Sequence, residues 1–350
     1  MTDQQWELLQ RVIRGERVEP LPVGFIIDCP WLPKWYGISI LDYFSNDELW
    51  LKANLKAMAD FPEVLFLPGF WSEFGMCTEP SAFGARTYFP ANEFPHAHRV
   101  IRSTAEIDDL PSPDPATDGL LPFVLNRLRL AQPAIEAAGH RIRFAVARGP
   151  LNIASYLMGS TEFLMAMMLE PEKAEALMKK ITAFLKSWLQ LQMKTFPSID
   201  GIFLLDDIIG FIGENEFRSF GLPYFKELYD LPVSVKFLHN DAACKVSAPY
   251  LPEIGVNLFN MGFDITLTAL KELTGSQVVY VTVSAARSPQ VERDIDPDTG
   301  LPYDLNPSFL TDALGDTNWL STDPKSGAFP NTHSGLATPA DDSLLHKVVI

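Results

Sequence analysis

Short apolar runs alternate with longer segments of helical spacing along most of the chain. Runs of about four to eight residues rich in β-branched and aromatic side chains are typical of buried strands. They occur at residues 21–27, 64–70, 143–147, 202–205, 233–238, 256–260 and 277–283. Apolar residues at helical spacing predict helices at residues 4–14, 47–60, 120–138, 161–168, 171–195, 244–251 and 266–273. The aromatic, proline-interrupted stretch 31–37 predicts a loop.

This alternation predicts the α/β class with a parallel sheet. Repeated strand and helix units over most of a chain of 350 residues favour a (β/α)8 TIM barrel, although two smaller domains also fit the length. The pattern fails beyond residue 283, because residues 285–340 are rich in Pro, Asp, Ser, Thr and Gly. We therefore predict one domain, residues 1–350, with an irregular tail at 284–350.

Charge narrows the classes of partner. The formal net charge is −16, which disfavours nucleic acid and anionic membranes because phosphates demand local positive charge. The chain shows neither a basic-then-apolar leader nor an apolar run long enough to span a bilayer, so we expect a soluble cytoplasmic protein. Cys29, Cys77 and Cys244 are far apart, which predicts free thiols without a disulfide framework.

Ionisable side chains end two neighbouring predicted strands. Asp206 and Asp207 follow the strand at 202–205, and His239 and Asp241 follow the strand at 233–238. Active sites of parallel α/β folds lie at such carboxyl ends. His239 and Asp241 share one side of an extended chain, so they could ligate a metal or act as an acid–base couple, and a rim histidine is the alternative. Asp206 and Asp207 could hold a cation or raise one pKa, or one of them could cap a helix.

Two aromatic stretches are candidate pocket walls. Trp31 and Trp35 lie in the predicted loop 31–37, and Trp71 and Glu73 lie in a second stretch, 71–79, after the strand at 64–70. Apolar walls with a few polar groups are typical of small-molecule sites. We expect these residues to contact substrate.

Three motifs resemble one known family. Arg148-Gly-Pro-Leu-Asn-Ile-Ala-Ser-Tyr-Leu is similar to a Gly-Pro-x-x-x-Ala-Ser-Tyr-Leu segment of the uroporphyrinogen decarboxylase superfamily. Residues 215–228 resemble its Phe-x-x-Pro-Tyr-x-Lys helix, and residues 79–85 resemble a short helix of the same family. The resemblance covers about residues 1–283 and implies a TIM barrel, in agreement with the pattern above. Within the first motif we expect Asn152 to contact substrate and Tyr156 to orient it.

The resemblance to true decarboxylases is incomplete. Their arginine-rich opening motif corresponds to residues 19–30, which contain no arginine. Their essential Asp corresponds to Gly75, with Glu73 nearby, and their substrate-binding Ser corresponds to Asp207, whereas their Tyr is kept as Tyr156. In the tail, His333 lies in a segment similar to a decarboxylase His-Gly turn. A substrate with many carboxylates would meet the wrong charges here.

Cobalamin-dependent methyltransferases of the superfamily place a His-x-Cys motif at this strand end and bind zinc through it. This chain keeps the histidine as His239 and has Asp241 in place of the cysteine. The resemblance therefore implies that His239 and Asp241, with Asp207, bind zinc or another divalent metal or work as acid and base, together with Asp206.

The function that the resemblance implies is methyl transfer between a small methylated compound and a corrinoid held on a partner protein. A cofactor-free decarboxylase of uroporphyrinogen type is the second prediction. A barrel that only binds a ligand is the third.

Overall fold

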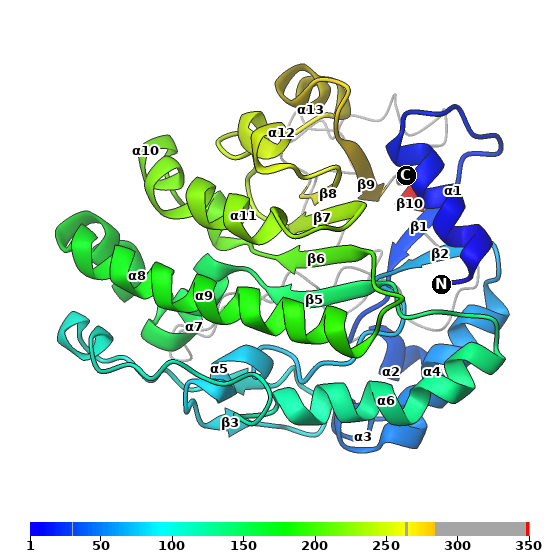
Figure 1. Cartoon of the computed structure of the whole chain (residues 1–350), viewed down its shortest axis with the longest axis horizontal. Helices are drawn as coiled ribbons and strands as arrows, with labels where there is room; N and C mark the ends of the chain where they lie inside the picture. The colour runs from blue at the N-terminus through cyan, green and yellow to red at the C-terminus, as the bar shows by residue number, and fades with distance from the viewer. Residues whose placement is uncertain (30, 263–264, 284–347, 350) are drawn as a thin grey trace, which may run out of the picture. The chain divides into compact units, whose positions relative to one another are not determined.

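The computed structural model describes residues 1–29, 31–262, 265–283 and 348–349. These residues form an α/β structure in which helices flank a twisted, mainly parallel sheet (Figure 1). The strands are β1 (Val23–Ile26), β2 (Val64–Leu67), β3 (Thr87–Tyr88), β4 (His96–Ala97), β5 (Phe144–Arg148), β6 (Gly201–Leu205), β7 (Val235–Asn240), β8 (Leu258–Met261), β9 (Val279–Val283) and β10 (Val348–Val349).

Helices occupy most of the intervals between strands. The longer ones are α1 (Asp3–Ile13), α4 (Asp47–Asp60), α6 (Leu121–Ala137), α7 (Pro150–Met158), α8 (Ser160–Leu169), α9 (Pro171–Thr195), α11 (Leu222–Tyr229) and α13 (Leu267–Thr274). The shorter ones are α2 (Trp31–Tyr36), α3 (Ile40–Ser45), α5 (Thr78–Ala82), α10 (Glu214–Glu216) and α12 (Leu251–Ile254). Single turns are η1 (Thr104–Ile107), η2 (Ile208–Gly210), the π-helical η3 (Phe217–Gly221) and η4 (Ala248–Tyr250).

Strand pairing sets the edge at which the site forms. β5, β6, β7, β8 and β9 pair in parallel in that order, and β1 pairs in parallel with β2. A short β10 runs antiparallel to the end of β9. In the described part of the chain β2 and β5 are edge strands that do not pair with each other. The parallel α/β prediction is confirmed, whereas closure into a (β/α)8 barrel stays a prediction.

Side chains satisfy the unpaired edge of β5. Gln192 of α9 accepts a hydrogen bond from the Val146 backbone N–H at 3.0 Å and donates one to the Val146 carbonyl at 2.9 Å. Glu79 of α5 accepts from the Arg148 N–H at 3.1 Å. Buried backbone groups must be paired, and here an amide and a carboxylate replace a neighbouring strand.

Contacts divide the chain into a first unit, Met1–Val281, and a second unit, Thr282–Val349. Most of the tail, including His333, lies outside the described residues. The single-domain prediction for residues 1–350 therefore stays a prediction.

Helix starts follow the capping rules. Thr2 and Gln5 form a capping box at α1, and Asn46 accepts from the Glu48 and Leu49 N–H groups at the start of α4. Each such cap satisfies amides that have no partner within the helix.

Two local predictions are wrong. The stretch 31–37 contains helix α2, because Pro33 lies in its first turn, where a missing N–H costs no helical hydrogen bond. The helix expected at 244–251 lies later, in η4 and α12. β7 also extends beyond its predicted end, so His239 is within the strand and Asp241 directly follows it.

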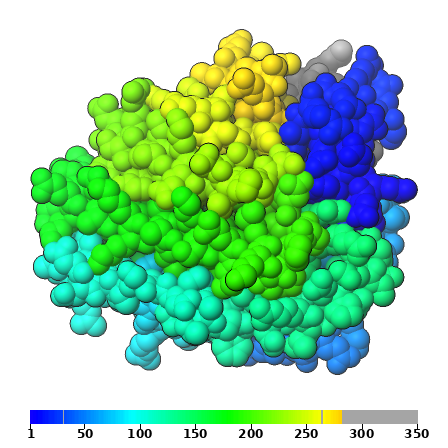
Figure 2. Space-filling model, in the orientation of Figure 1, coloured from blue at the N-terminus to red at the C-terminus, as the bar shows by residue number. Residues whose placement is uncertain are grey.

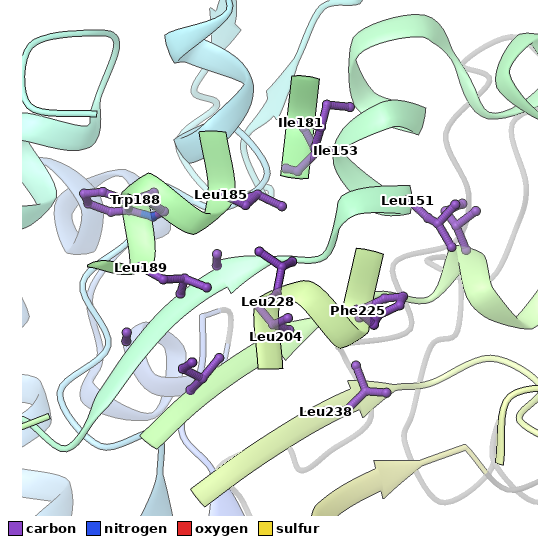
Figure 3. Packing of buried hydrophobic residues seen from close by; sticks show 14 of the residues in the cluster. Leu151, Ile153, Ile181, Leu185, Trp188, Leu189, Leu204, Phe225, Leu228 and Leu238 are labelled. Atoms are coloured by element: carbon purple, nitrogen blue, oxygen red, sulfur yellow. The ribbon is translucent and has the colours of Figure 1, made fainter. Parts of the chain in front are cut away.

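The core lies where α7, α9 and α11 pack on the sheet. Leu185 and Leu189 of α9 lie over Leu204 of β6 and close to Leu228 of α11, as Figure 3 shows. Full burial of each such leucine contributes roughly 1.5–3 kcal/mol. The side chains of α9 and its neighbours then cover the strands on the face seen in Figure 2. This packing holds the carboxyl ends of β5, β6 and β7 together.

The cysteines and the helix lengths bear on two properties considered from the sequence, disulfide bonding and membrane spanning. Cys29, Cys77 and Cys244 are buried, and they form no disulfide. Among the described residues, every helix is too short or too polar to cross a membrane.

Candidate active site

The carboxyl ends of β6 and β7 bring together the predicted acids and histidine. Leu205 pairs with His239 in the parallel register, and the Asp206 N–H donates to the His239 carbonyl at 3.0 Å. Asp207 comes after Asp206 at the end of β6, Asp241 directly follows β7, and the Asp207 carboxylate accepts from the Asp241 N–H at 2.8 Å. The four predicted strand-end residues therefore occupy one edge of the sheet.

His239 is buried between two oxygen acceptors. Its Nδ1 lies 2.5 Å from Oδ1 of Asn260 on β8, and its Nε2 lies 3.4 Å from Oδ2 of Asp241. Asn260 donates through its Nδ2 to the Val281 carbonyl at 2.7 Å. This bond orients the amide so that Oδ1 faces the imidazole, and Nδ1 therefore carries a proton.

The surroundings favour the imidazolium form. Burial opposes charge on His239, but the Asp241 carboxylate, with a further contribution from Asp207, raises the pKa of His239 to about 9. The structure thus brings His239 and Asp241 together, and their role stays a prediction. At neutral pH the pair is a proton donor beside an anion.

Asp206 caps a helix of the neighbouring βα unit. Helix α7 begins after Gly149, which has no side chain to cap it. The Asp206 carboxylate accepts from the N–H groups of Leu151 at 2.9 Å and Asn152 at 3.1 Å, and also from Ile208 at 3.2 Å. Burial, together with the Asp207 charge, raises the pKa of Asp206 to about 8, while these three hydrogen bonds act in the opposite direction. The capping alternative describes its contacts best.

Asn152 is held by the backbone at both ends of its amide. Its Nδ2 donates to the Leu205 carbonyl at 3.2 Å, and its Oδ1 accepts from the Asp207 and Ile208 N–H groups at 3.1 and 3.2 Å. Asn152 thus fixes the turn that carries Asp206 and Asp207.

A buried ion pair stands at the end of β5. Arg148 Nη2 lies 2.7 Å from Glu73 Oε2, and both residues are buried. The guanidinium stacks 5.2 Å from the ring of Trp71, which packs edge-on against Phe203 of β6 at 5.7 Å. Burial raises the pKa of Glu73, although Arg148 opposes the shift. Because such a pair has a high desolvation cost, it is more informative about function than about stability.

Two further carboxyls face this cluster. Burial raises the pKa of Glu79 to about 7, with Arg148 opposing. Burial and the Glu73 charge raise the pKa of Asp28 well above its usual range, while His239 opposes. Asp28 therefore lies within electrostatic reach of both the Arg148 pair and the His239 pair.

The other residues predicted to contact or orient substrate lie in two separate places. Tyr156 of α7 is half-buried near Arg148 and Asp207, and burial raises its pKa, with Arg148 opposing. Trp31 and Trp35 stack on each other with centroids 5.6 Å apart, and Trp35 also contacts Phe61. Trp71 thus lies at the Arg148 cluster, whereas Trp31 and Trp35 form a separate aromatic stack along α2.

Metal ligation requires several donors at one point. In residues 1–29, 31–262, 265–283 and 348–349, no three His, Cys, Asp or Glu side chains are grouped so that they could hold a metal ion. His239 and Asp241 are paired with each other, and Asp207 contacts the backbone of Asp241.

The family model for uroporphyrinogen decarboxylase (URO-D) matches residues 4–284. The chain belongs to the uroporphyrinogen decarboxylase family.

Three curated relatives share about a quarter of the aligned residues with this chain. A uroporphyrinogen decarboxylase of Hamiltonella defensa is 28% identical over 284 residues, which is 77% of this chain and 72% of that protein. The enzyme of Dichelobacter nodosus is 25% identical over 87% of this chain and 83% of its own length. The match to the enzyme of Alcanivorax borkumensis is 24% identical and spans 63% of each protein.

A solved structure agrees with the fold. A methyltransferase from Methanosarcina mazei superposes with a TM-score of 0.65 at 18% identity, covering 87% of this chain and 88% of that one. This likeness supports the uroporphyrinogen decarboxylase-like fold.

Several site residues were missing from the sequence prediction. Arg148 belongs to the quoted family motif, and Asp28 ends a predicted strand as Asp206 does, so both carried a usable signal. Glu79 lies in the second aromatic stretch. Asn260 is the hardest of these residues to predict from the sequence, because it is a neutral residue at the end of a predicted strand.

Proposed function

We propose that this protein is a (β/α)8-barrel methyltransferase of the uroporphyrinogen decarboxylase superfamily. It would move a methyl group between a small O-, N- or S-methyl compound and a corrinoid on a partner protein. One observation carries the proposal: a buried histidine is held for the charged form between Asn260 and Asp241 at the sheet edge. The fold likeness to a methyltransferase supports it.

His239 would act as the general acid. When the bond between the methyl carbon and the heteroatom breaks, the electron pair stays on the heteroatom, and the Nε2 proton of His239 neutralises it. Before the proton leaves, the Asp241 carboxylate, 3.4 Å from Nε2, would favour the imidazolium form, and Asn260 would hold the ring in place. Positioned acids of this kind contribute about 10²- to 10⁴-fold to rate. A bound corrinoid would supply the acceptor for the methyl group.

Other residues would bind and orient the substrate. Tyr156 would direct the heteroatom toward His239, and Trp71 would wall the site beside the Arg148–Glu73 pair. Trp31 and Trp35 would extend the apolar surface. Asp207 would hold the backbone of Asp241 through the 2.8 Å hydrogen bond.

The described residues do not fit zinc or another divalent metal. Zinc sites use three or four protein donors, and among the described residues no group of three His, Cys, Asp or Glu side chains could hold a metal ion. The proposed methyl transfer therefore does not use a metal ion.

Decarboxylation is the second candidate, because the curated relatives carry that name. The carboxyls Asp28, Glu73, Asp207 and Asp241 surround this site, whereas Arg148 is already paired. A substrate with many carboxylates would be repelled here. A barrel that only binds a ligand would keep binding without turnover.

The test is a turnover assay with purified protein, reduced cobalamin and a panel of O-, N- and S-methyl compounds, followed by methylcobalamin absorbance. We expect one class to react and His239→Gln to slow it about 10²- to 10⁴-fold. His98→Gln is the matched control, since His98 is exposed on the β3–β4 hairpin.

Carbon dioxide release from uroporphyrinogen in a parallel assay would favour the decarboxylase. Full methyl transfer by His239→Gln would contradict the proposed acid. Loss of transfer on chelation, with stoichiometric bound metal, would contradict the metal-free route.

A further inference from the structure

A small cavity lies at the unpaired edge of β5, behind the Arg148–Glu73 ion pair. Its volume is about 10 Å³. The walls that matter here are Glu73, Glu79, Arg148 and Trp188 of α9. It occupies the place where Glu79 and Gln192 substitute for a paired strand.

Three buried polar atoms of these lining residues have no hydrogen-bond partner within the described residues. They are Glu79 Oε2, Arg148 Nη1 and Trp188 Nε1. The three residues are only 3%, 4% and 1% exposed. A buried polar atom without a hydrogen-bond partner is unfavourable, so three such atoms on residues that line one cavity call for a common partner.

The chemistry of these atoms identifies that partner. Two are N–H donors and one is a carboxyl oxygen, so the partner must accept twice and donate at least once. A cavity of about 10–15 Å³ holds one water molecule, and buried waters typically make about three hydrogen bonds. A larger ligand would not fit in this volume.

We propose that this cavity is a binding site for one resident water molecule. The water accepts hydrogen bonds from Arg148 Nη1 and Trp188 Nε1 and donates one to Glu79 Oε2. It thereby links α9 and α5 across the edge of β5 and completes the hydrogen bonding of Arg148 between Glu73 and Glu79. By donating to the Glu79 carboxylate, it also favours the ionised form of a group whose burial opposes charge.

The direct test is NMR of the indole N–H groups in the full chain, comparing nuclear and rotating-frame Overhauser cross-peaks with water. Trp188 is expected to show a cross-peak of opposite sign in the two experiments, which marks a bound water rather than proton exchange. Trp188→Phe assigns the signal by its loss. Trp50 is the matched control, because its buried Nε1 donates to the Trp71 carbonyl at 3.1 Å, and it should show no such cross-peak.

Thr78 also lines the cavity and its hydroxyl could relay magnetisation. The cross-peak should therefore persist in Thr78→Val. A crystal structure at high resolution should place one density peak within hydrogen-bond distance of all three atoms. An absent or exchange-only cross-peak at Trp188, or direct pairing of Glu79 Oε2 with Arg148 Nη1 or Trp188 Nε1, would overturn the proposal.

Discussion

Asp206 and Asp207 are consecutive in sequence, yet their side chains contact opposite neighbours of β6. Asp206 faces the β5 side, where its carboxylate accepts three backbone hydrogen bonds and caps α7. Asp207 faces the β7 side, where it accepts one backbone hydrogen bond and adds negative charge near His239. A carboxylate that accepts several backbone hydrogen bonds, as Asp206 does, stabilises the local fold. A carboxylate that acts mainly through its charge, as Asp207 does, can raise the pKa of a neighbouring acid.

The largest expected effect is on stability at the β5 side. Asp206→Ala leaves three amides without their acceptor in a site from which water is excluded, and we expect a loss of about 4 kcal/mol in the free energy of unfolding. Urea denaturation measures it. Asp207→Ala is the matched control and should cost about 1 kcal/mol, because one hydrogen bond is lost. Equal costs for the two variants would remove the distinction between the two sides.

On the β7 side, we expect the contribution of His239 to the free energy of unfolding to depend on pH. The pKa of His239 is raised from 6.5 to about 9 in the folded protein. Its contribution is therefore fully present below pH 6.5 and is lost as pH rises through about 9. We expect the difference in the free energy of unfolding between wild type and His239→Gln to decrease by an amount on the order of 3 kcal/mol across that pH range. A difference that is constant with pH would show that the histidine keeps its ordinary pKa.

A smaller effect is expected at the cap itself. A Cβ at Gly149 would clash with Asp206 Oδ2 and lie 2.5 Å from the Asp206 Cβ, so Gly149→Ala should cost about 2 kcal/mol through overpacking. Gly213 is the matched control, since it also precedes a helix with similar backbone angles and an added Cβ would meet only the end of the Glu216 side chain. Gly213→Ala should change stability by less than about 0.5 kcal/mol. Similar costs at both positions would mean that the Asp206 carboxylate can move away.

The sequence predicted most of the parallel α/β framework because hydrophobic periodicity reports burial directly. It also placed Asp206, Asp207, His239 and Asp241 together, since carboxyl ends of parallel strands share one edge. It left open which acid caps a helix, because that depends on Gly149 and on the approach of α7. The Arg148–Glu73 pair joins residues 75 positions apart, and no local pattern encodes such a contact. Helix α2 differs from the predicted loop because Pro33 lies in the first turn, where proline does not interrupt a helix.

An NMR titration of the His239 imidazole measures whether this residue is a charged acid held by Asp241. Signals are assigned by the His239→Gln variant, and Asp241→Asn is titrated beside wild type. We expect a pKa of about 9 in wild type and a lower pKa in Asp241→Asn, because the carboxylate that favours the proton is gone. A wild-type His239 that titrates at or below its ordinary value of 6.5, or a pKa unchanged in Asp241→Asn, would contradict the account.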